Sequence, residues 1–191
     1  MVPVDAVIAA LTASIPERAH LLADLRASVC AQTVPPGLHL VGVDHARRGP
    51  AVVRNELAQA VPSGWLAFVD DDDLWHPTHL ETLLAHSEGV DVVYSLAEIV
   101  GRPGWDPQQE AFDERRLRRV NYIPLTGLVR AELFHAVGGF PDTGYEDWGL
   151  WLGLLDHGAR FRCVPERTWT YRFGDWDSRS KEVWDGRRKV S

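Results

Sequence analysis

The sequence predicts an α/β domain in which a mostly parallel central sheet is flanked by helices. Short apolar runs alternate with helix-length segments through the first half of the 191-residue chain, which is the pattern of consecutive βαβ units. The composition, with 45% hydrophobic and 25% charged residues, is that of an ordinary globular domain. The net charge of −7 argues against nucleic acid as the main partner, because phosphate backbones bind surfaces rich in Lys and Arg.

The first half contains four apolar runs that favour strands and three segments that favour helices. Strands are expected at Val7–Leu11, Leu38–Val43, Trp65–Val69 and Val90–Tyr94. Helices are expected at Pro16–Ala31, at about Ala51–Ala60 and from Pro77 to about His86. Ser14 and Glu17 have the spacing of a capping box, which predicts that the first helix begins directly after them.

The second half is less regular and suggests a smaller antiparallel element. A loop at Gly101–Asp113 and a charge cluster at Glu114–Arg119 precede an expected strand at Tyr122–Val129. A Gly-Gly-Phe-Pro turn at 138–141 is followed by an amphipathic helix at Asp147–His157, which Gly158 ends. Two short strands are expected at Arg160–Val164 and Trp169–Phe173, before a polar tail at 174–191. We treat residues 1–191 as a single domain.

Polar residues at strand ends are the first candidates for a binding site. In parallel α/β sheets, ligands lie beyond the carboxyl ends of the strands. Thr12, Asp44 and the four aspartates Asp70–Asp73 follow three of the expected strands. We therefore expect these residues to open onto one edge of the sheet.

The four consecutive aspartates require compensation, because adjacent carboxylates repel one another unless a cation or hydrogen-bond donors neutralise them. Oxygen ligands suit Mg²⁺ or Mn²⁺, and Mg²⁺ is commonly held by one or two carboxylates together with substrate phosphates. This favours a metal–nucleotide site. The alternative is a solvated acidic turn that caps the helix beginning at Pro77.

A second acidic pair, Glu146 and Asp147, stands at the start of the later helix. Carboxylates at a helix N-terminus can serve only as caps. Alternatively, one of them is a catalytic base, provided that the helix directs its start toward the aspartate cluster. Trp148 and Trp151, three residues apart on this helix, are expected in the core rather than in a sugar platform.

Three further features bear on location and chemistry. Cys30 and Cys163 lack the spacing of a disulfide framework or metal knuckle and are expected to be buried or inert thiols. The apolar run near the N-terminus contains Asp5 and is too short to span a bilayer, which indicates a cytoplasmic protein, with peripheral membrane association left open. Trp176 and Trp184 in the tail are candidates for a lid.

Two motifs resemble those of the family 2 glycosyltransferases, which have the GT-A fold. The first is Phe68–Pro77, with the sequence FVDDDDLWHP, preceded by Val53-Arg54-Asn55. The second is Val137–Pro141, with the sequence VGGFP, followed by Glu146-Asp147-Trp148. Both occur in the order that the family shows, and the resemblance extends from about Val7 to Phe173.

The resemblance implies a role for each matching residue. Asp72 corresponds to the aspartate of the DxD-type motif that reaches Mn²⁺ or Mg²⁺ on the donor diphosphate. Nucleotide-sugar binding is implied for Thr12 and Asp44 at the nucleobase, for Arg54 in the preceding segment, and for Asp70 and Asp71 near the ribose or behind the metal. Asp147 corresponds to the catalytic base, with Glu146 beside it. Residues 1–100 would form the nucleotide-binding half and 101–173 the acceptor half.

Some positions depart from the family pattern. His45-Ala46-Arg47 follows Asp44 where the family often has Asp-Gly-Ser, and Leu11–Ser14 replaces Pro-Thr-Tyr-Asn and its aromatic ring. Gly149 and Gly153 occupy positions often held by Asp and Arg. The chain has no Gln-x-x-Arg-Trp motif, which argues against a processive polysaccharide synthase.

Together these features predict an inverting, metal-assisted, hexosyltransferase-like enzyme that uses a nucleoside diphosphate sugar, with UDP- or dTDP-sugars favoured. The acceptor, whether glycan, lipid-linked sugar or small molecule, stays open. A non-catalytic GT-A module that binds a nucleotide or glycan is the alternative. A phosphatase of the Asp-x-Asp type is disfavoured, because Leu74 stands where that motif needs Thr or Val.

Overall fold

The computed structural model describes residues 7–102, 111–142 and 144–174, so the tail with Trp176 and Trp184 lies outside the described residues. Seven strands form one sheet: β1 (Ile8–Ser14), β2 (Leu38–Val43), β3 (Trp65–Phe68), β4 (Leu74–Trp75), β5 (Val92–Val100), β6 (Gly127–Arg130) and β7 (Phe161–Arg172). The helical segments are η1 (Pro16–Leu21), α1 (Leu22–Cys30), α2 (Pro50–Ala58), α3 (His79–Ala85), α4 (Glu114–Leu117), α5 (Ala131–Ala136) and α6 (Glu146–Asp156).

The strand order is β2-β1-β3-β6-β5-β7-β4. Strands β2, β1 and β3 pair in parallel, as do β5 and β7, and these pairs contain most of the paired residues. The antiparallel pairs involve β6, between β3 and β5, and the short β4 at the edge. This architecture confirms the predicted α/β class with a mostly parallel sheet.

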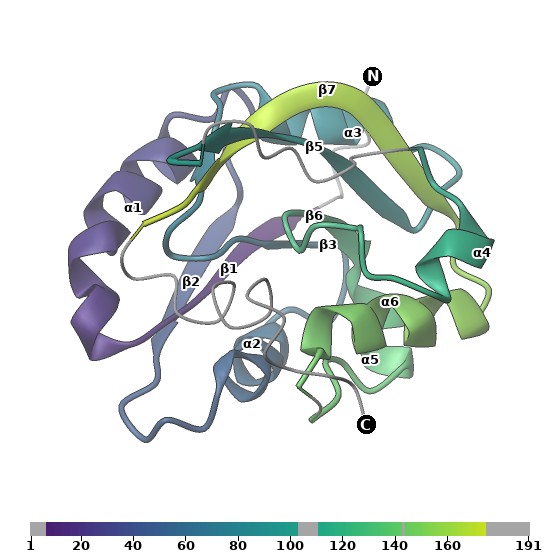
Figure 1. The fold of residues 1–191 in the computed structure, drawn as a ribbon, viewed down its shortest axis with the longest axis horizontal. Coiled ribbons are helices and arrows are strands. Elements are labelled where there is room, and N and C mark those ends of the chain that lie inside the picture. The colour runs from purple at the N-terminus through teal and green to yellow at the C-terminus, as the bar shows by residue number, and fades with distance from the viewer. Residues whose placement is uncertain (1–6, 103–110, 143, 175–191) are drawn as a thin grey trace.

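Helices cover both faces of the sheet (Figure 1). One hydrophobic cluster packs α1 and α3 against the face that carries Ala10, Ala67 and Val93. The other packs α2, α5 and α6 against the face that carries Leu11, Phe68 and Tyr94. Trp151 is buried in this second cluster, as predicted, and Trp148 packs against it while half-buried. No helix within the described ranges is both long and apolar enough to cross a membrane.

The first helix differs from its prediction. It begins as a 3-10 segment over Pro16–Leu21 and becomes α-helical only at Leu22. The residue at its N-cap is Ile15, and no side chain caps it. The predicted capping box is therefore wrong: Ser14 is still part of β1, and its hydroxyl donates to Asp71 instead.

Proline explains two differences in the second half. The expected strand at Tyr122–Val129 is reduced to Gly127–Arg130, and Pro124, which cannot donate to a strand ladder, lies in the segment that is not a strand. The two short strands expected at 160–173 are one strand, β7. Its pairing with β5 shifts register between Val164 and Arg167, so Pro165 lies in a bulge that keeps the strand continuous.

Candidate active site

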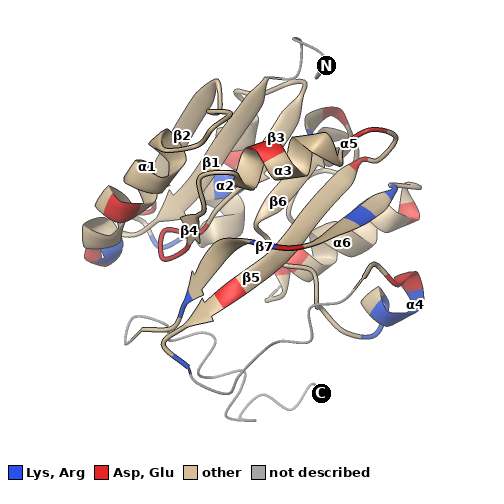
Figure 2. Cartoon of the chain, turned by 90° about the horizontal axis from the view of Figure 1, so that it is seen from above, with Lys and Arg blue, Asp and Glu red and all other residues tan. Residues whose placement is uncertain are grey.

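The carboxyl ends of β1, β2 and β3 meet at one edge of the sheet. Ser14 pairs with Val43 at the ends of β1 and β2, and β3 ends at Phe68 beside Leu11. Asp44 follows β2 directly, and the loop Asp70–Asp73, called the aspartate cluster below, follows β3. Figure 2 marks this acidic loop in red beside β4. The predicted convergence of these aspartates is confirmed.

Thr12 differs from its predicted position. It lies inside β1 rather than after it, because the strand continues to Ser14. Its side chain is fully buried, and its hydroxyl is 3.2 Å from Nε2 of His39 on β2. Thr12 therefore lies behind the edge, and Ser14 is the β1 residue that reaches the aspartate cluster.

Asp44 is buried and held by the loop that follows it. Its Oδ2 accepts a hydrogen bond of 2.7 Å from the Gly49 backbone N–H. Burial opposes ionisation of this carboxyl, but the N–H groups of Gly49, Arg48 and Ala46 outweigh it and lower the pKa of Asp44. Its Oδ1 is buried, lies 4.0 Å from Nε of Arg48 and has no hydrogen-bond partner among the described residues. The Asp44 carboxylate thus keeps one acceptor atom that makes no hydrogen bond, next to the Arg48 guanidinium.

Two of the clustered aspartates share an arginine that the sequence did not single out. Nη2 of Arg18, on η1, lies 2.7 Å from Oδ1 of Asp71 and also contacts Oδ2 of Asp72. The second oxygen of Asp71 accepts a 2.6 Å hydrogen bond from Ser14. The expected counter-charge is therefore supplied partly by the protein itself.

Burial and the neighbouring carboxylates raise the pKa values of Asp71, Asp72 and Asp73. Burial, reinforced by the charge of Asp70, raises the pKa of Asp72 to about 6, although Arg18 opposes this. Burial also raises the pKa of Asp71 and, more strongly, that of Asp73. Oδ1 of Asp73 is buried without a hydrogen-bond partner in the described part of the chain. Further positive charge at this loop would relieve the repulsion.

Arg54 connects the aspartate cluster with the second acidic motif. This buried side chain on α2 contacts Oδ1 of Asp70 through Nη2, and its Nη1 lies 3.8 Å from Oε1 of Glu146. Its guanidinium also lies over the ring of Phe140, 5.5 Å from the centroid. One cation therefore brings together residues from the loop after β3, from α6 and from the Gly-Gly-Phe-Pro turn.

Asn55 fixes that turn against α2. Its Nδ2 donates to the Phe140 carbonyl and its Oδ1 accepts from the Phe140 N–H, both at 2.9 Å. Gly139 precedes Phe140 with a φ of 77°, and a Cβ there would collide with Oδ1 of Asn55. This explains why the motif has glycine at this position.

Asp147 lies in the first turn of α6 and is held in a fixed orientation. Asn121 donates to its Oδ2 at 2.8 Å, and the Trp148 backbone N–H donates to its Oδ1 at 2.8 Å. Burial raises the pKa of Asp147, as does the neighbouring Glu146, against the effect of these donors. A carboxylate has about four lone-pair sites, so two remain for a proton from another group.

The sequence itself shows the family. The profile described as Glycosyl transferase family 2 matches residues 24–141, which include the aspartate cluster and the Gly-Gly-Phe-Pro turn. The chain belongs to glycosyltransferase family 2. Among curated proteins, none matches this family 2 chain.

Solved glycosyltransferase structures share the fold of this family 2 chain. Residues 1–349 of Staphylococcus aureus TarS, in complex with UDP-GlcNAc, match with a TM-score of 0.72 at 15% identity, covering 96% of this chain and 62% of that fragment. The mannosyltransferase PcManGT from Pyrobaculum calidifontis, in complex with GDP-Man and Mn²⁺, matches with a TM-score of 0.70 at 14% identity, covering 97% and 65%. The family 2 chain thus spans less than two thirds of the chains it matches.

The sequence missed four residues that shape this family 2 site. Besides Ser14 and Arg18, these are Asn121, which positions Asp147, and Arg172, whose Nε donates to the Asp72 carbonyl at 2.5 Å. Arg18 lies within η1 and Arg172 is the last residue of β7. The need of four adjacent aspartates for counter-charge was the signal that could have pointed to these two basic residues. Nothing in the sequence near Asn121 indicates its contact with α6.

Within the described ranges, no three His, Cys, Asp or Glu side chains are arranged to hold a metal ion by themselves. The two cysteines are free; Cys163 is half-buried, and Cys30, the last residue of α1, is exposed, so burial fails for Cys30 and the prediction of an inert thiol is untested. The protein groups alone thus supply at most part of a coordination sphere.

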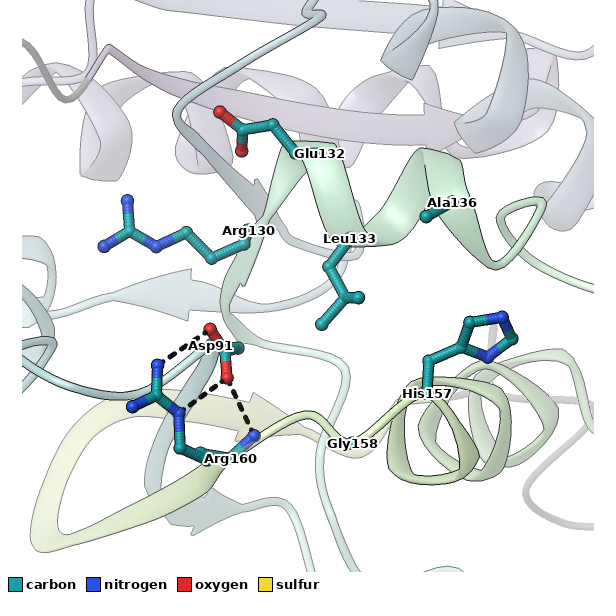
Figure 3. A pocket seen from close by; sticks show the side chains of 8 residues that line it. All are labelled: Asp91, Arg130, Glu132, Leu133, Ala136, His157, Gly158 and Arg160. Atoms are coloured by element: carbon teal, nitrogen blue, oxygen red, sulfur yellow. Dashed lines mark hydrogen bonds and ion pairs between the residues drawn. The ribbon is translucent and has the colours of Figure 1, made fainter.

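A pocket of about 670 Å³ lies at the opposite end of the sheet (Figure 3). It is open and lined by residues that include Asp91, Arg130, Leu133, His157 and Arg160. Its Asp91 and Arg160 already satisfy each other through bonds of 2.9–3.4 Å. Because parallel α/β sheets bind ligands at the carboxyl edge, we place the active site at the aspartate cluster rather than in this pocket.

Proposed function

We propose that this protein is an inverting glycosyltransferase that transfers a hexose from a nucleoside diphosphate to an acceptor hydroxyl. Family membership and the fold shared with sugar-nucleotide complexes of TarS and PcManGT support this proposal. The observation that carries it is the bridge made by Arg54 between Asp70 and Glu146. This bridge supports the proposal, because Arg54 contacts both an acid proposed to bind the donor and the helix proposed to carry the base.

In this proposal the nucleobase lies against Asp44. Oδ1 of Asp44 makes no hydrogen bond among the described residues and lies 4.0 Å from Nε of Arg48, and it is an acceptor suited to the imide N–H of uracil or thymine. This favours UDP- or dTDP-sugars. Asp70, Asp71 and Arg54 would surround the ribose and diphosphate, and Thr12 would support this wall of the site from within β1.

The donor set fits a divalent cation such as Mn²⁺ or Mg²⁺. All candidate ligands are carboxylate oxygens, and the side chain of Asp70 is 40% exposed while that of Asp72 is 17% exposed. Mg²⁺ usually takes only one or two carboxylates and completes its sphere with water and substrate phosphates, so the absence of a third ligand is no obstacle. Asp72 would hold the cation, which when bound stabilises negative charge on the leaving diphosphate.

Asp147 would act as the general base. It takes the proton from the acceptor hydroxyl while the acceptor oxygen bonds to the anomeric carbon and the bond from that carbon to the diphosphate oxygen breaks. Displacement from the opposite face inverts the configuration. Such base assistance is typically worth about 10²–10⁴-fold in rate.

A panel of nucleoside diphosphates and their sugars tests this function. Thermal unfolding with and without MnCl₂ should show stabilisation by UDP or dTDP, because a ligand at 100 times its Kd adds about 2.7 kcal/mol. The stabilising sugar nucleotide should then be hydrolysed slowly without an acceptor. Binding without any turnover would favour the non-catalytic module, and no stabilisation by any nucleotide would contradict the proposal.

A further inference from the structure

Arg18 occupies the aspartate cluster from outside the family motifs. It stands on η1, and its side chain is 23% exposed, against 4% for Asp71 and 17% for Asp72. Its Nη2 contacts both carboxylates, at 2.7 Å in the case of Asp71. The Arg18 side chain is therefore more exposed than the two carboxylates that its guanidinium contacts.

The two carboxylates depend on Arg18 to different degrees. Asp71 is also anchored by the Ser14 hydroxyl at 2.6 Å, within the protein. For Asp72, Arg18 is the basic group that contacts the carboxylate, whereas Arg172 binds the backbone carbonyl of the same residue. Loss of the Arg18 contact would thus leave Asp71 in place and free the Asp72 carboxylate.

We propose that Arg18 is a resident cation of the aspartate cluster and must leave the Asp72 carboxylate before a divalent metal ion can bind there. A guanidinium and a divalent ion at the same carboxylate oxygen repel each other. A diphosphate gives Arg18 an alternative, because guanidinium groups bind phosphate oxygens through paired hydrogen bonds. Metal binding would therefore be weak until a nucleoside diphosphate is present. This inference rests on the proposed function, which assigns the metal to Asp72.

The test measures binding of MnCl₂ alone, without nucleotide, to the full chain. Free Mn²⁺ is followed by its electron paramagnetic resonance signal in wild type, Arg18→Gln, Arg18→Lys and Arg160→Gln. Arg160, which pairs with Asp91 at the other end of the sheet, is the matched control. We expect Arg18→Gln to bind Mn²⁺ at least about tenfold more tightly than wild type, because a tenfold change in affinity needs only about 1.4 kcal/mol. The Mn²⁺ affinities of Arg18→Lys and Arg160→Gln should stay near that of wild type.

Arg18→Gln can also destabilise the fold, because it removes the counter-charge of two carboxylates. We therefore compare the unfolding temperature of each protein in EDTA with that in MnCl₂. Mn²⁺ should raise the unfolding temperature of Arg18→Gln more than that of wild type. Equal Mn²⁺ affinity in wild type and Arg18→Gln, or equal destabilisation in EDTA and MnCl₂, overturns the proposal. If UDP with Mn²⁺ still binds the wild type, the glycosyltransferase function survives that result. If Arg18→Gln binds Mn²⁺ more tightly but neither wild type nor the variant binds any nucleotide, the role of Arg18 as resident cation is supported and the glycosyltransferase function is refuted.

Discussion

Asn55 and Phe140 join two distant motifs through a reciprocal pair of hydrogen bonds, each 2.9 Å long. The side-chain amide of Asn55 hydrogen-bonds both the N–H and the C=O of Phe140, as the backbone of a neighbouring strand would do in a sheet. Because Arg54 precedes Asn55 on α2, the same contact holds the turn before α6 next to Arg54, which lies over the Phe140 ring and near Glu146. The candidate site is thus held together by side-chain contacts from α2 to the Gly-Gly-Phe-Pro turn and α6, in addition to the sheet.

Asn55→Ala should destabilise the protein, because it leaves two partly buried backbone groups without partners. An unpaired buried donor or acceptor costs about 1–3 kcal/mol, so we expect a loss of that order or more in the free energy of unfolding by urea. Asn55→Asp keeps the acceptor for the Phe140 N–H but loses the donor, and should lie between wild type and Asn55→Ala. A fully stable Asn55→Ala variant would show that the turn holds its place without this residue.

His79 offers a pH dependence that is separate from the active site. Its ring stacks on Trp75 with 4.9 Å between centroids, and its Nδ1 lies 2.7 Å from the hydroxyl of Thr168. Burial lowers the pKa of His79 to about 3. The unfolded chain therefore binds a proton below about pH 6.5 that the folded protein does not bind.

Stability should consequently fall as the pH drops from about 6.5 toward 3. A single such group contributes roughly 1.4 kcal/mol per pH unit in this window, and this part of the stability is fully present above pH 6.5. His79→Gln should flatten the slope of unfolding free energy between pH 6 and about 4.5 by about that amount. His157→Gln, which removes an exposed histidine, is the control. An unchanged slope in His79→Gln would mean that other groups cause the acid sensitivity.

Asp44→Asn should alter the choice of nucleobase. An asparagine can still accept from the Gly49 N–H through its amide oxygen, but it then presents an NH₂ donor where Asp44 presents an acceptor. The uracil imide N–H loses its partner, whereas N3 of cytosine gains one. By calorimetry, UDP affinity should fall by about 1–3 kcal/mol and the preference for UDP over CDP should shrink or invert. If UDP and CDP keep their original ratio, Asp44 does not read the base.

The sequence predicted those parts of the protein that depend on local patterns. The strand Leu38–Val43 was predicted with its observed bounds, and the helix after Gly49 and the aspartate cluster at the end of β3 also lie where expected. Predictions from local sequence patterns were wrong where a residue far away in the sequence binds the same side-chain atoms. Ser14 is the clearest case, because its hydroxyl has the spacing of a helix cap and binds Asp71, 57 positions away, instead.

Contacts of high sequence separation also explain why Arg18, Asn121 and Arg172 were not predicted as site residues. Arg172 reaches Asp72 across 100 positions, and Asn121 reaches Asp147 across 26. No local sequence pattern around these residues indicates which distant residues they contact. They follow from the insertion of β6 between β3 and β5 and from the parallel pairing of β5 with β7, which bring both halves of the chain to one sheet edge.

Asp147→Asn should separate catalysis from binding. The variant keeps an oxygen and the shape of the side chain, so the helix start should remain folded, but it can no longer take up a proton. We expect the affinity for UDP in MnCl₂ to stay within a few-fold and the hydrolysis of the UDP-sugar to fall by about 10²-fold or more. Glu146→Gln should be milder. Near wild-type turnover in Asp147→Asn would remove Asp147 from the role of base.

The most direct test of the account is calorimetric binding of UDP in the presence and absence of MnCl₂ by wild type, Asp72→Asn and Asp156→Asn. Asp156 is an exposed aspartate paired with Arg118 and serves as the matched control. We expect MnCl₂ to strengthen UDP binding to wild type and to Asp156→Asn, and we expect Asp72→Asn to lose about tenfold or more of that affinity. Equal, Mn²⁺-independent UDP affinities in all three proteins would contradict a metal–nucleotide site at the aspartate cluster.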